Sequence, residues 1–407
     1  MSAVRILRVA AGGDGVGRLE DGRAVFVPRS APGDLVELTG LRSQRRYARA
    51  RVARVLEPGP DRIEPPCPHY VDDECGGCQL QHLAAGAQRE VRRTIVGDAL
   101  RRLARLDVSD PEIEPAARAL EYRTKITLHA DARAGTIGLH PYGRAEQVFD
   151  LRRCLITVAE VNRLWAALRP QRRFFPPRLQ TLMLRLDRRG ACHAVFQSAS
   201  GTRWSEAATL REALVAEGVE ATIWWREEGG MPRHVAGPDE SFPATVFEQV
   251  HPEMGDRVRA FAVAALGSAA NRLVWDLYAG IGETTAALAK TGARVESVES
   301  DSRAVAEAEA RGPAARRLTG RVEDVLGRLT APDLVVTNPP RVGMEPQVPA
   351  ELGRRRPERI VYISCDPATL ARDLSRLTTY RIGALRAFDL FPQTAHVETV
   401  AVLERAS

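Results

Sequence analysis

The chain has 407 residues, of which 44% are hydrophobic and 27% are charged, and its formal net charge is +6. This length allows two or three domains with cores of their own, and the composition is ordinary for a soluble globular protein. No apolar run is long enough to span a membrane, and the first residues lack the apolar segment of a signal peptide, so we expect a cytoplasmic protein. Nothing in the sequence indicates a partner subunit, so a monomer is the default expectation.

The basic residues are nearly all arginines, because Lys125 and Lys290 are the only lysines. The codon bias of a GC-rich genome explains much of this preference. Arginine is also the side chain whose planar guanidinium suits phosphate recognition. The charge balance is therefore compatible with a nucleic-acid partner without establishing one.

The first 57 residues alternate short β-prone runs with glycine turns, which predicts a small OB-like β-barrel. The expected strands lie at 4–10, 24–28, 35–40 and 47–57. The stretch from Arg42 to Arg54, "RSQRRYARARVAR", holds six arginines, one tyrosine and no acid. It is typical either of a solvated strand face or of a platform for single-stranded nucleic acid, and both interpretations stay open here.

A proline-rich segment at 57–68 marks a boundary, and a group of cysteines follows it. Cys67, Cys75 and Cys78 have the spacing C-x7-C-x2-C, and Cys154 lies far downstream in "VFDLRRC". In a cytoplasmic chain such thiols are more often metal ligands or reactive groups than disulfides. Four thiolates would hold a [4Fe–4S] cluster, although the spacing alone also allows zinc or unligated cysteines.

Residues 87–106 have apolar side chains at helical spacing, which predicts an amphipathic helix. A strand-rich region follows from about 120 to 245. From 246 onward, expected strands at 273–279, 294–300, 333–340, 359–366 and 396–404 alternate with helical segments. This alternation predicts a doubly wound, Rossmann-like α/β sheet. We therefore expect a barrel at 1–57, a central domain at 58–245 and an α/β domain at 246–407.

The first strand of the α/β region runs into the glycine loop "DLYAGIGETT". A dinucleotide fingerprint would have a third glycine where Thr285 stands, so NAD fits poorly. Glu299 ends the next strand, where a ribose hydroxyl is usually held. S-adenosylmethionine, a nucleoside without pyrophosphate, suits this loop better. A plain tight turn would explain the glycines but not the acid.

Three further strand ends carry candidate chemistry. "NPPR" places Asn338 after one strand, and it resembles the motif of enzymes that methylate exocyclic amino groups. Cys365 ends the following strand, directly before the N-cap Asp366 and Pro367, so we expect the helix N-terminus to lower the pKa of its thiol. Glu398 lies on the last strand, facing the same side as His396, where it would be placed to take a proton.

Together these motifs resemble the bacterial RNA uridine-5 methyltransferase family, in particular the 23S ribosomal RNA enzymes with an N-terminal TRAM barrel. The resemblance covers nearly the whole chain, with eight motifs in the family's order, which are "CGGCQLQHL", "YRTK", "VFDLRRC", "FEQV", "DLYAGIGETT", "NPPRVG", "ISCDPATLARD" and "HVETV".

By this resemblance, Cys365 is the expected nucleophile and Glu398 the expected general base. The resemblance also implies S-adenosylmethionine as the methyl donor, with Gln249, Tyr278, Glu299 and Asn338 as its contacts. It further implies a [4Fe–4S] cluster held by Cys67, Cys75, Cys78 and Cys154. The expected product is 5-methyluridine in 23S ribosomal RNA, formed through a covalent adduct between Cys365 and carbon-6 of the uracil.

The chain departs from the family pattern at Asn338, where aspartate is usual, and at Asp366, where asparagine is usual. We expect the first change to alter the affinity for the methyl donor rather than abolish it. The same chemistry on tRNA is the nearest alternative. A non-catalytic RNA-binding protein is a second one, and a cytosine-5 methyltransferase is disfavoured because "NPPRVG" lacks the extra cysteine of those enzymes.

Overall fold

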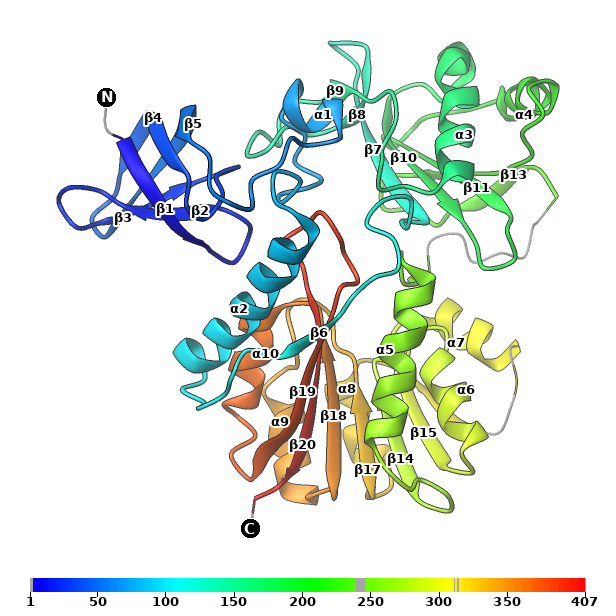
Figure 1. The fold of residues 1–407 in the computed structure, drawn as a ribbon. Helices are drawn as coiled ribbons and strands as arrows, with labels where there is room; N and C mark the ends of the chain where they lie inside the picture. The colour runs from blue at the N-terminus through cyan, green and yellow to red at the C-terminus, as the bar shows by residue number, and fades with distance from the viewer. Residues whose placement is uncertain (1–2, 239–245, 311, 313–314, 407) are drawn as a thin grey trace. The chain divides into compact units, whose positions relative to one another are not determined.

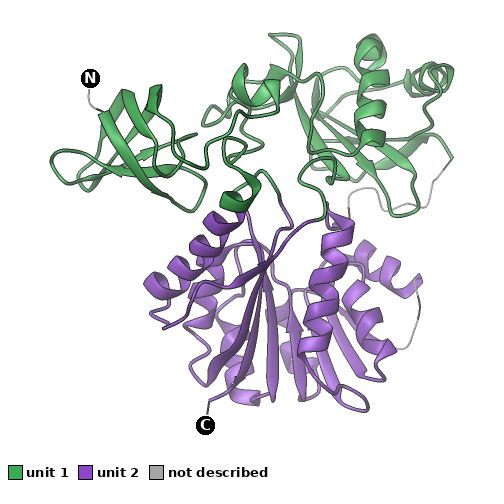
Figure 2. Ribbon diagram, viewed as in Figure 1, with its two compact units in different colours: residues 1–88, 117–245, 392–395 green, residues 89–116, 246–391, 396–407 purple. Residues whose placement is uncertain are grey.

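The computed structural model describes residues 3–238, 246–310, 312 and 315–406. The chain forms two compact units, which Figure 2 colours separately. Unit 1 comprises residues 1–88, 117–245 and 392–395, and unit 2 comprises residues 89–116, 246–391 and 396–407. Each unit is thus assembled from segments that are far apart in the sequence. Of the helices described, none has the length and apolar character needed to cross a membrane.

Unit 1 begins with a closed β-barrel of strand order β1-β2-β3-β5-β4, drawn in blue in Figure 1. Its strands are β1 (Ala3–Val9), β2 (Gly15–Arg18), β3 (Ala24–Val27), β4 (Leu35–Ser43) and β5 (Tyr47–Glu57). Alternate residues of each strand point inward, so Val4 and Ile6 of β1 pack with Val25 and Val27 of β3. The predicted barrel is confirmed, with a small aliphatic core.

The rest of unit 1 is built on a seven-stranded sheet of order β13-β12-β11-β10-β7-β8-β9. Its strands are β7 (Lys125–Asp131), β8 (Thr136–Leu139), β9 (Phe149–Asp150), β10 (Leu179–Leu186), β11 (Cys192–Ser198), β12 (Thr222–Glu227) and β13 (Arg233–Ala236). Its helices are α1 (Pro68–Val71), α3 (Ala159–Leu168), the 3-10 helix η1 (Arg169–Phe174) and α4 (Ala207–Ala216). Trp165 of α3 and Leu210 of α4 share one core with Leu182 of β10, so both helices cover the same face of the sheet.

Unit 2 is built on an eight-stranded sheet of order β16-β15-β14-β17-β18-β20-β19-β6. Its strands are β6 (Glu112–Glu114), β14 (Leu273–Leu277), β15 (Arg294–Glu299), β16 (Ala315–Thr319), β17 (Leu334–Thr337), β18 (Arg359–Ser364), β19 (Tyr380–Phe388) and β20 (Glu398–Arg405). The first five strands in the order from β16 to β18 are parallel, whereas β20 is antiparallel to both of its neighbours. The order reverses between β14 and β17, which is where open α/β sheets bind ligands.

Helices cover both faces of this sheet (Figure 1). They are α2 (Ala85–Leu103), α5 (Pro252–Ala265), α6 (Glu283–Lys290), α7 (Ser302–Ala310), α8 (Val322–Val325), η2 (Leu326–Arg328), α9 (Gln347–Arg355) and α10 (Pro367–Leu374). Trp275 of β14 packs in a core with α2, α9 and α10, whereas its neighbour Val274 packs with α5 and α6. Such alternation of buried side chains identifies strands that are covered on both faces. The predicted doubly wound α/β fold is confirmed.

The predicted helix at 87–106 corresponds to α2, and most of it belongs to unit 2 together with β6. The barrel and the central sheet belong to one unit. Neither unit is one continuous stretch of chain. The domain boundaries predicted at residues 57 and 245 divide the sequence linearly, and they stay predictions.

A buried ion pair fixes α2 to the sheet of unit 2. The Arg92 guanidinium lies 2.7 Å from the Asp389 carboxylate, and both side chains are buried. In Arg92→Leu the Asp389 charge would stay buried without its partner, so we expect a loss of about 3–5 kcal/mol in unfolding free energy. Arg102→Leu, which removes an exposed arginine from the same helix, should cost less than about 1 kcal/mol. Urea unfolding measures both, and equal losses would contradict this role of Arg92.

Candidate active site

The candidate residues of unit 2 converge on one edge of its sheet. Carboxyl ends of parallel strands meet at the same edge, and an antiparallel neighbour begins there. Glu299, Asn338 and Cys365 therefore follow or end β15, β17 and β18 at the edge where β20 begins with Glu398. Tyr278 joins them at the end of β14, next to the reversal of strand order.

The glycine loop after β14 has the geometry of a ligand cradle. Gly280 and Gly282 both have positive φ, at 55° and 75°, a conformation that side chains with a Cβ rarely adopt. A Cβ at Gly282 would lie 2.8 Å from the Cβ of Ala308, so this glycine is needed for close packing against α7. A Cβ at Gly280 would meet nothing within 4 Å, which leaves the backbone there open to a ligand.

Glu299 is held at the mouth of this cradle by its own neighbours. One carboxylate oxygen accepts a hydrogen bond from the Gly280 N–H at 2.9 Å, and the other accepts from the Asp301 N–H at 2.8 Å. The oxygen that faces Asp301 also accepts from the Ser300 hydroxyl at 3.1 Å. The oxygen that faces Gly280 keeps a further lone pair, so Glu299 can still accept from a hydroxyl of a ligand. A ribose with two vicinal hydroxyls is the ligand that such a carboxylate at the second strand commonly holds.

Two residues flank the reversal of strand order. The Asn338 N–H donates to the Leu277 carbonyl at 3.1 Å, which ties the loop after β17 to β14. Tyr278 has φ of 62°, and its buried hydroxyl has no hydrogen-bond partner among the described residues. A buried polar atom of this kind needs an explanation, and a bound ligand would supply one. The open glycine loop, Glu299 and this hydroxyl together fit a nucleoside cofactor.

Gln249 is the fourth predicted cofactor contact, and the structure places it just before α5. A Cβ at Gly255 would lie 2.9 Å from the Gln249 Cβ, so the chain before α5 packs closely on that helix. The contacts described for Gln249 are with α5, and its role toward a cofactor stays a prediction.

Cys365 and Glu398 are brought opposite each other by the antiparallel register of β18 and β20. Ser364 pairs with Thr399 at the end of the ladder, so the next residues along the two strands are Cys365 and Glu398. Glu398 is buried, and one of its carboxylate oxygens has no hydrogen-bond partner in the described part of the chain. The thiol and the carboxyl group, 33 residues apart in sequence by the difference 398 − 365, thus face one site.

Burial dominates the electrostatics of this pair. It raises the pKa of Glu398 to about 8, while the Arg341 guanidinium acts in the opposite direction. Burial also raises the pKa of the Cys365 thiol, and Glu398 and Asp366 add to the increase, whereas Arg341 opposes it. The prediction that the helix N-terminus lowers the pKa of this thiol is therefore wrong for the free protein, because desolvation and two nearby carboxyl groups outweigh the helix.

The loop after Asn338 contributes a residue that the sequence analysis did not count in the site. Arg341 lies close enough to act on both Cys365 and Glu398. Its backbone carbonyl accepts from the Thr369 hydroxyl of α10 at 2.9 Å. The buried Asp373, also of α10, accepts from the Met344 N–H at 2.8 Å and from the Tyr362 hydroxyl at 2.7 Å. The motif "ISCDPATLARD" ends at Asp373, so the sequence did contain a signal for the importance of this residue.

Asp276 is a further buried acid that sequence reasoning missed. It lies within β14 and accepts a hydrogen bond from the Thr285 hydroxyl of α6 at 2.5 Å. Burial raises its pKa to about 6, and Thr285 acts in the opposite direction. Thr285 stands where a dinucleotide loop would have glycine, so this contact explains why the sequence has a hydroxyl there: it ties the helix to the strand on either side of the loop.

The four predicted cluster ligands gather in unit 1, away from these strand ends in sequence. Cys67, Cys78 and Cys154 share one small hydrophobic cluster. Cys75 interacts electrostatically with Cys67 and Cys154. The donor chemistry thus suits a soft metal. The positions of the side chains do not suit a metal ion. Among residues 3–238, 246–310, 312 and 315–406, no three His, Cys, Asp or Glu side chains are placed to hold one. The [4Fe–4S] cluster stays a prediction.

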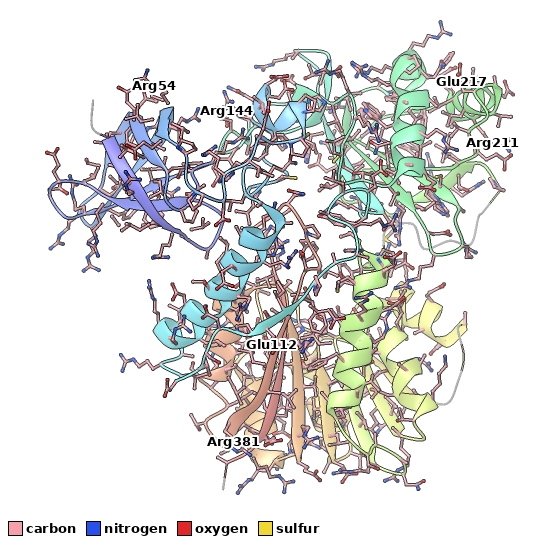
Figure 3. The ribbon with its side chains drawn as sticks, viewed as in Figure 1. Arg54, Glu112, Arg144, Arg211, Glu217 and Arg381 are labelled. Atoms are coloured by element: carbon pink, nitrogen blue, oxygen red, sulfur yellow. The ribbon has the colours of Figure 1, made fainter. Side chains whose placement is uncertain are left out.

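The arginine-rich stretch lies along β4, β5 and the turn between them. Three of its arginines pair with acids from other segments, since Arg49 contacts Asp14, Arg51 contacts Glu74 and Arg54 contacts Glu37. These pairs are exposed on the arginine side, as Arg54 in Figure 3 illustrates. Arg45 and Arg46 lie exposed at the turn, and Arg42 lies exposed near the end of β4. The basic surface is therefore partly neutralised, which sequence letters within 42–54 could not reveal.

The sheet order, the glycine loop and the acid after β15 define an S-adenosylmethionine-dependent methyltransferase. The sequence profile of tRNA (Uracil-5-)-methyltransferases matches residues 312–406, and that of the TRAM domain matches residues 3–53. An uncharacterized RNA methyltransferase of Streptomyces coelicolor is 32% identical, over 99% of this chain and 93% of the relative. The chain belongs to the RNA (uracil-5-)-methyltransferase family.

Relatives with named substrates are similar over equally long stretches. The 23S rRNA (uracil(1939)-C(5))-methyltransferase RlmD of Azoarcus sp. is 31% identical, over 97% of both chains. The enzyme of the same name from Chromohalobacter salexigens is 32% identical, over 98% of this chain and 88% of its own. The structure of the Pyrococcus abyssi tRNA (uracil-54, C5)-methyltransferase with S-adenosyl-L-homocysteine superposes with a TM-score of 0.73, at 21% identity, over 98% of this chain and 100% of that one. This last similarity shows the shared fold.

The burial of Glu398 has a consequence for the pH dependence of stability. Since its pKa rises from 4.5 to about 8 on folding, the folded state binds this proton more tightly than the unfolded state. Its contribution is complete below about pH 4.5 and is lost as the pH rises toward about 8. Between about pH 5 and about pH 8 the unfolding free energy of the wild type should fall, relative to Glu398→Gln, by on the order of a few kcal/mol. Urea unfolding measures it, and parallel pH profiles would contradict the assignment.

Proposed function

We propose that this enzyme methylates carbon-5 of a uridine in 23S ribosomal RNA, with Cys365 as nucleophile and Glu398 as general base. The observation that carries the proposal is the register of β18 and β20, which sets a half-buried thiol opposite a buried carboxyl group at the ligand-binding edge of the sheet. S-adenosylmethionine would be held by the glycine loop, Glu299, Tyr278 and Asn338, and when bound it supplies an electrophilic methyl group.

The thiol is required because carbon-5 of uracil is a poor nucleophile. Addition of the Cys365 thiolate to carbon-6 breaks the 5,6 double bond and gives an enolate, whose electron pair makes carbon-5 nucleophilic. Carbon-5 then takes the methyl group, whose bond to the sulfonium sulfur of the donor breaks with the electron pair staying on sulfur. At this point carbon-5 carries both the new methyl group and its original proton. Removal of that proton by the Glu398 carboxylate returns the electron pair to the ring, re-forms the double bond and expels the thiolate.

Both groups must be ionised to act, although burial favours their neutral forms. Arg341 is the cation that acts on both, and it favours the thiolate and the carboxylate alike. A pKa of about 8 makes Glu398 a stronger base than an ordinary carboxylate once it is ionised. We therefore expect kcat/KM to increase with pH toward about 8, in contrast to the profile of an enzyme that uses an exposed carboxylate.

The relatives with assigned substrates favour ribosomal RNA. Two of them, at 31–32% identity over nearly the full chain, are named for uracil 1939 of 23S rRNA. The tRNA enzyme with known structure is more distant, at 21% identity. The barrel with its exposed Arg42, Arg45 and Arg46 suits the phosphates of an RNA substrate. The same chemistry on tRNA is the second candidate.

The assay measures transfer of labelled methyl groups to separate 23S rRNA and tRNA transcripts, followed by nucleoside analysis. Wild-type protein should give label in 5-methyluridine from 23S rRNA. Cys365→Ser should lose activity by about a thousandfold or more, since the adduct cannot form. Glu398→Gln should still form the adduct but release it slowly, so that RNA stays bound to the protein under denaturing conditions.

The outcomes separate the parts of this proposal. Label in tRNA alone would keep the mechanism and replace the substrate. Full activity of Cys365→Ser would exclude the adduct. The absence of a trapped complex in Glu398→Gln, with activity lost, would assign the proton transfer to another group. Cys192→Ser, which changes a half-buried cysteine of the central sheet, is the matched control and should keep wild-type activity.

A second part of the proposal concerns the four cysteines of unit 1. We propose that Cys67, Cys75, Cys78 and Cys154 hold a [4Fe–4S] cluster once their side chains reorient around it. The support is their shared burial and mutual proximity, together with four thiols as the donor set. No step of the methyl transfer depends on this cluster, so its role would be to stabilise unit 1.

Protein purified without oxygen tests this part directly. We expect about four irons and four sulfides per chain and the visible absorbance of an iron–sulfur cluster. Cys75→Ser should lower the iron content and the thermal stability, whereas Cys192→Ser should change neither. Zinc in place of iron, or four unligated thiols with unchanged stability in Cys75→Ser, would overturn it.

A further inference from the structure

The loop between Asn338 and α9 ends in a tip that solvent surrounds. Pro340, Arg341 and Val342 are all exposed, and the Val342 side chain, at 72%, is the most exposed large hydrophobic group among the described residues. An isolated exposed aliphatic side chain usually needs no explanation. This one directly follows Arg341, which acts on both Cys365 and Glu398. The backbone of Arg341 and Val342 is also hydrogen-bonded to α10, which begins two residues after Cys365, so the tip lies near the proposed reacting pair.

The tip is exposed but is fixed from below by α10. The Val342 carbonyl accepts from Arg372 at 2.6 Å, the Arg341 carbonyl accepts from Thr369 at 2.9 Å, and the Met344 N–H donates to the buried Asp373 at 2.8 Å. These contacts use backbone atoms of the loop. The Val342 side chain is left out of them, so the loop presents it to solvent in a fixed position.

Gly343 shows how closely the base of the loop is packed. It has φ of 80°, and a Cβ at this position would lie 2.3 Å from atoms of Thr369 and Arg372 and 2.4 Å from the Asp373 carboxylate. Only glycine allows both this backbone conformation and this approach. The chain has thus adopted a demanding geometry that holds an apolar side chain out beside its catalytic thiol.

An exposed apolar side chain beside the site could help to extrude a uridine from folded RNA. A uridine within a stack must leave it before its carbon-6 can reach a half-buried thiol, and the gap that it leaves costs stacking energy. Proteins that open base stacks commonly fill the gap with a rigid apolar side chain. Resting on the proposed uridine chemistry, we propose that Val342 enters the RNA stack in place of the extruded target uridine, with Arg341 turned toward the reacting pair.

The geometry favours Val342 over other side chains near the site. Cys365 and Glu398 are needed for the chemistry, and Arg341 is charged and acts on both of them. Tyr278 is held within the core that covers β14. Val342 is apolar and is 72% exposed, so it can contact the RNA without leaving a packing position. It is a positioning residue, because it would hold the target out of the stack and would not touch the reacting atoms.

The test compares one RNA in two states. The first is the folded transcript that the wild type methylates, and the second is a short single-stranded oligonucleotide with the same sequence around the labelled uridine. For Val342→Ala we expect kcat/KM on the folded transcript to fall by about tenfold and on the oligonucleotide by less than about twofold, because no stack must be opened in the latter. Val342→Leu should keep both rates. Val215→Ala, which changes an exposed valine of α4, is the matched control.

A second readout keeps the test independent of the rate on the oligonucleotide. With 2-aminopurine beside the target in the folded transcript, wild-type protein should increase its fluorescence as the neighbouring uridine leaves the stack. Val342→Ala should give a smaller increase at saturating protein, and Val342→Leu a full one. Equal losses on both RNAs, or an unchanged fluorescence increase, would overturn the role of Val342. A wild type that labels neither RNA would instead overturn the proposed function.

Discussion

The antiparallel pairing of β20 with β18 brings the thiol of Cys365 and the carboxyl group of Glu398 to one edge of the sheet, and the proposed chemistry depends on it. If β20 ran parallel to β18, its first residue would lie at the opposite edge of the sheet, and the carboxyl group of Glu398 could not approach Cys365. In the proposed mechanism, this one antiparallel strand adds a general base to the edge of the sheet at which the parallel strands would hold the nucleoside of the methyl donor. The remaining parts of the candidate site, from the glycine loop to Asp373, lie at or pack against this same edge of the sheet.

Bringing Glu398 to this edge costs free energy, because its carboxyl group is buried away from water. The ionised carboxylate of Glu398 would be better solvated in water. In the protein, one of its oxygens has no hydrogen-bond partner among the described residues. Such a group resists ionisation, yet it becomes a strong base when it ionises. The nearby Arg341 is exposed and offers only partial compensation. The free enzyme therefore holds its two reactive groups largely in their neutral forms, which also limits unwanted oxidation or alkylation of the thiol.

The fold and most residues of the candidate site could be predicted from the sequence. The protonation of the thiol, the ion pairs of the barrel and the orientation of the cysteines could not, because they depend on three-dimensional packing. The glycine loop, Glu299, Asn338 and Cys365 lie at the carboxyl ends of predicted strands, so their common edge could be predicted from parallel topology. The protonation of Cys365 was predicted wrongly, because desolvation and the charge of Glu398 arise only from three-dimensional packing. The ion pairs of Arg49 and Arg51 involve acids from distant segments, Asp14 and Glu74, whereas Arg54 contacts Glu37 on the paired strand β4. The spacing of four cysteines suggested their grouping, but spacing contains no information on how their side chains point.

The division of the chain into two units has a consequence for synthesis. The polypeptide passes from one unit to the other after residues 88, 116, 245, 391 and 395. β20 is the last strand of this sheet to be made, whereas α2 and β6 of the same unit emerge early. Val96 and Leu100 of α2 must then wait for partners such as Tyr362 and Leu403. Unit 2 therefore cannot close its core on the ribosome until β20 has emerged.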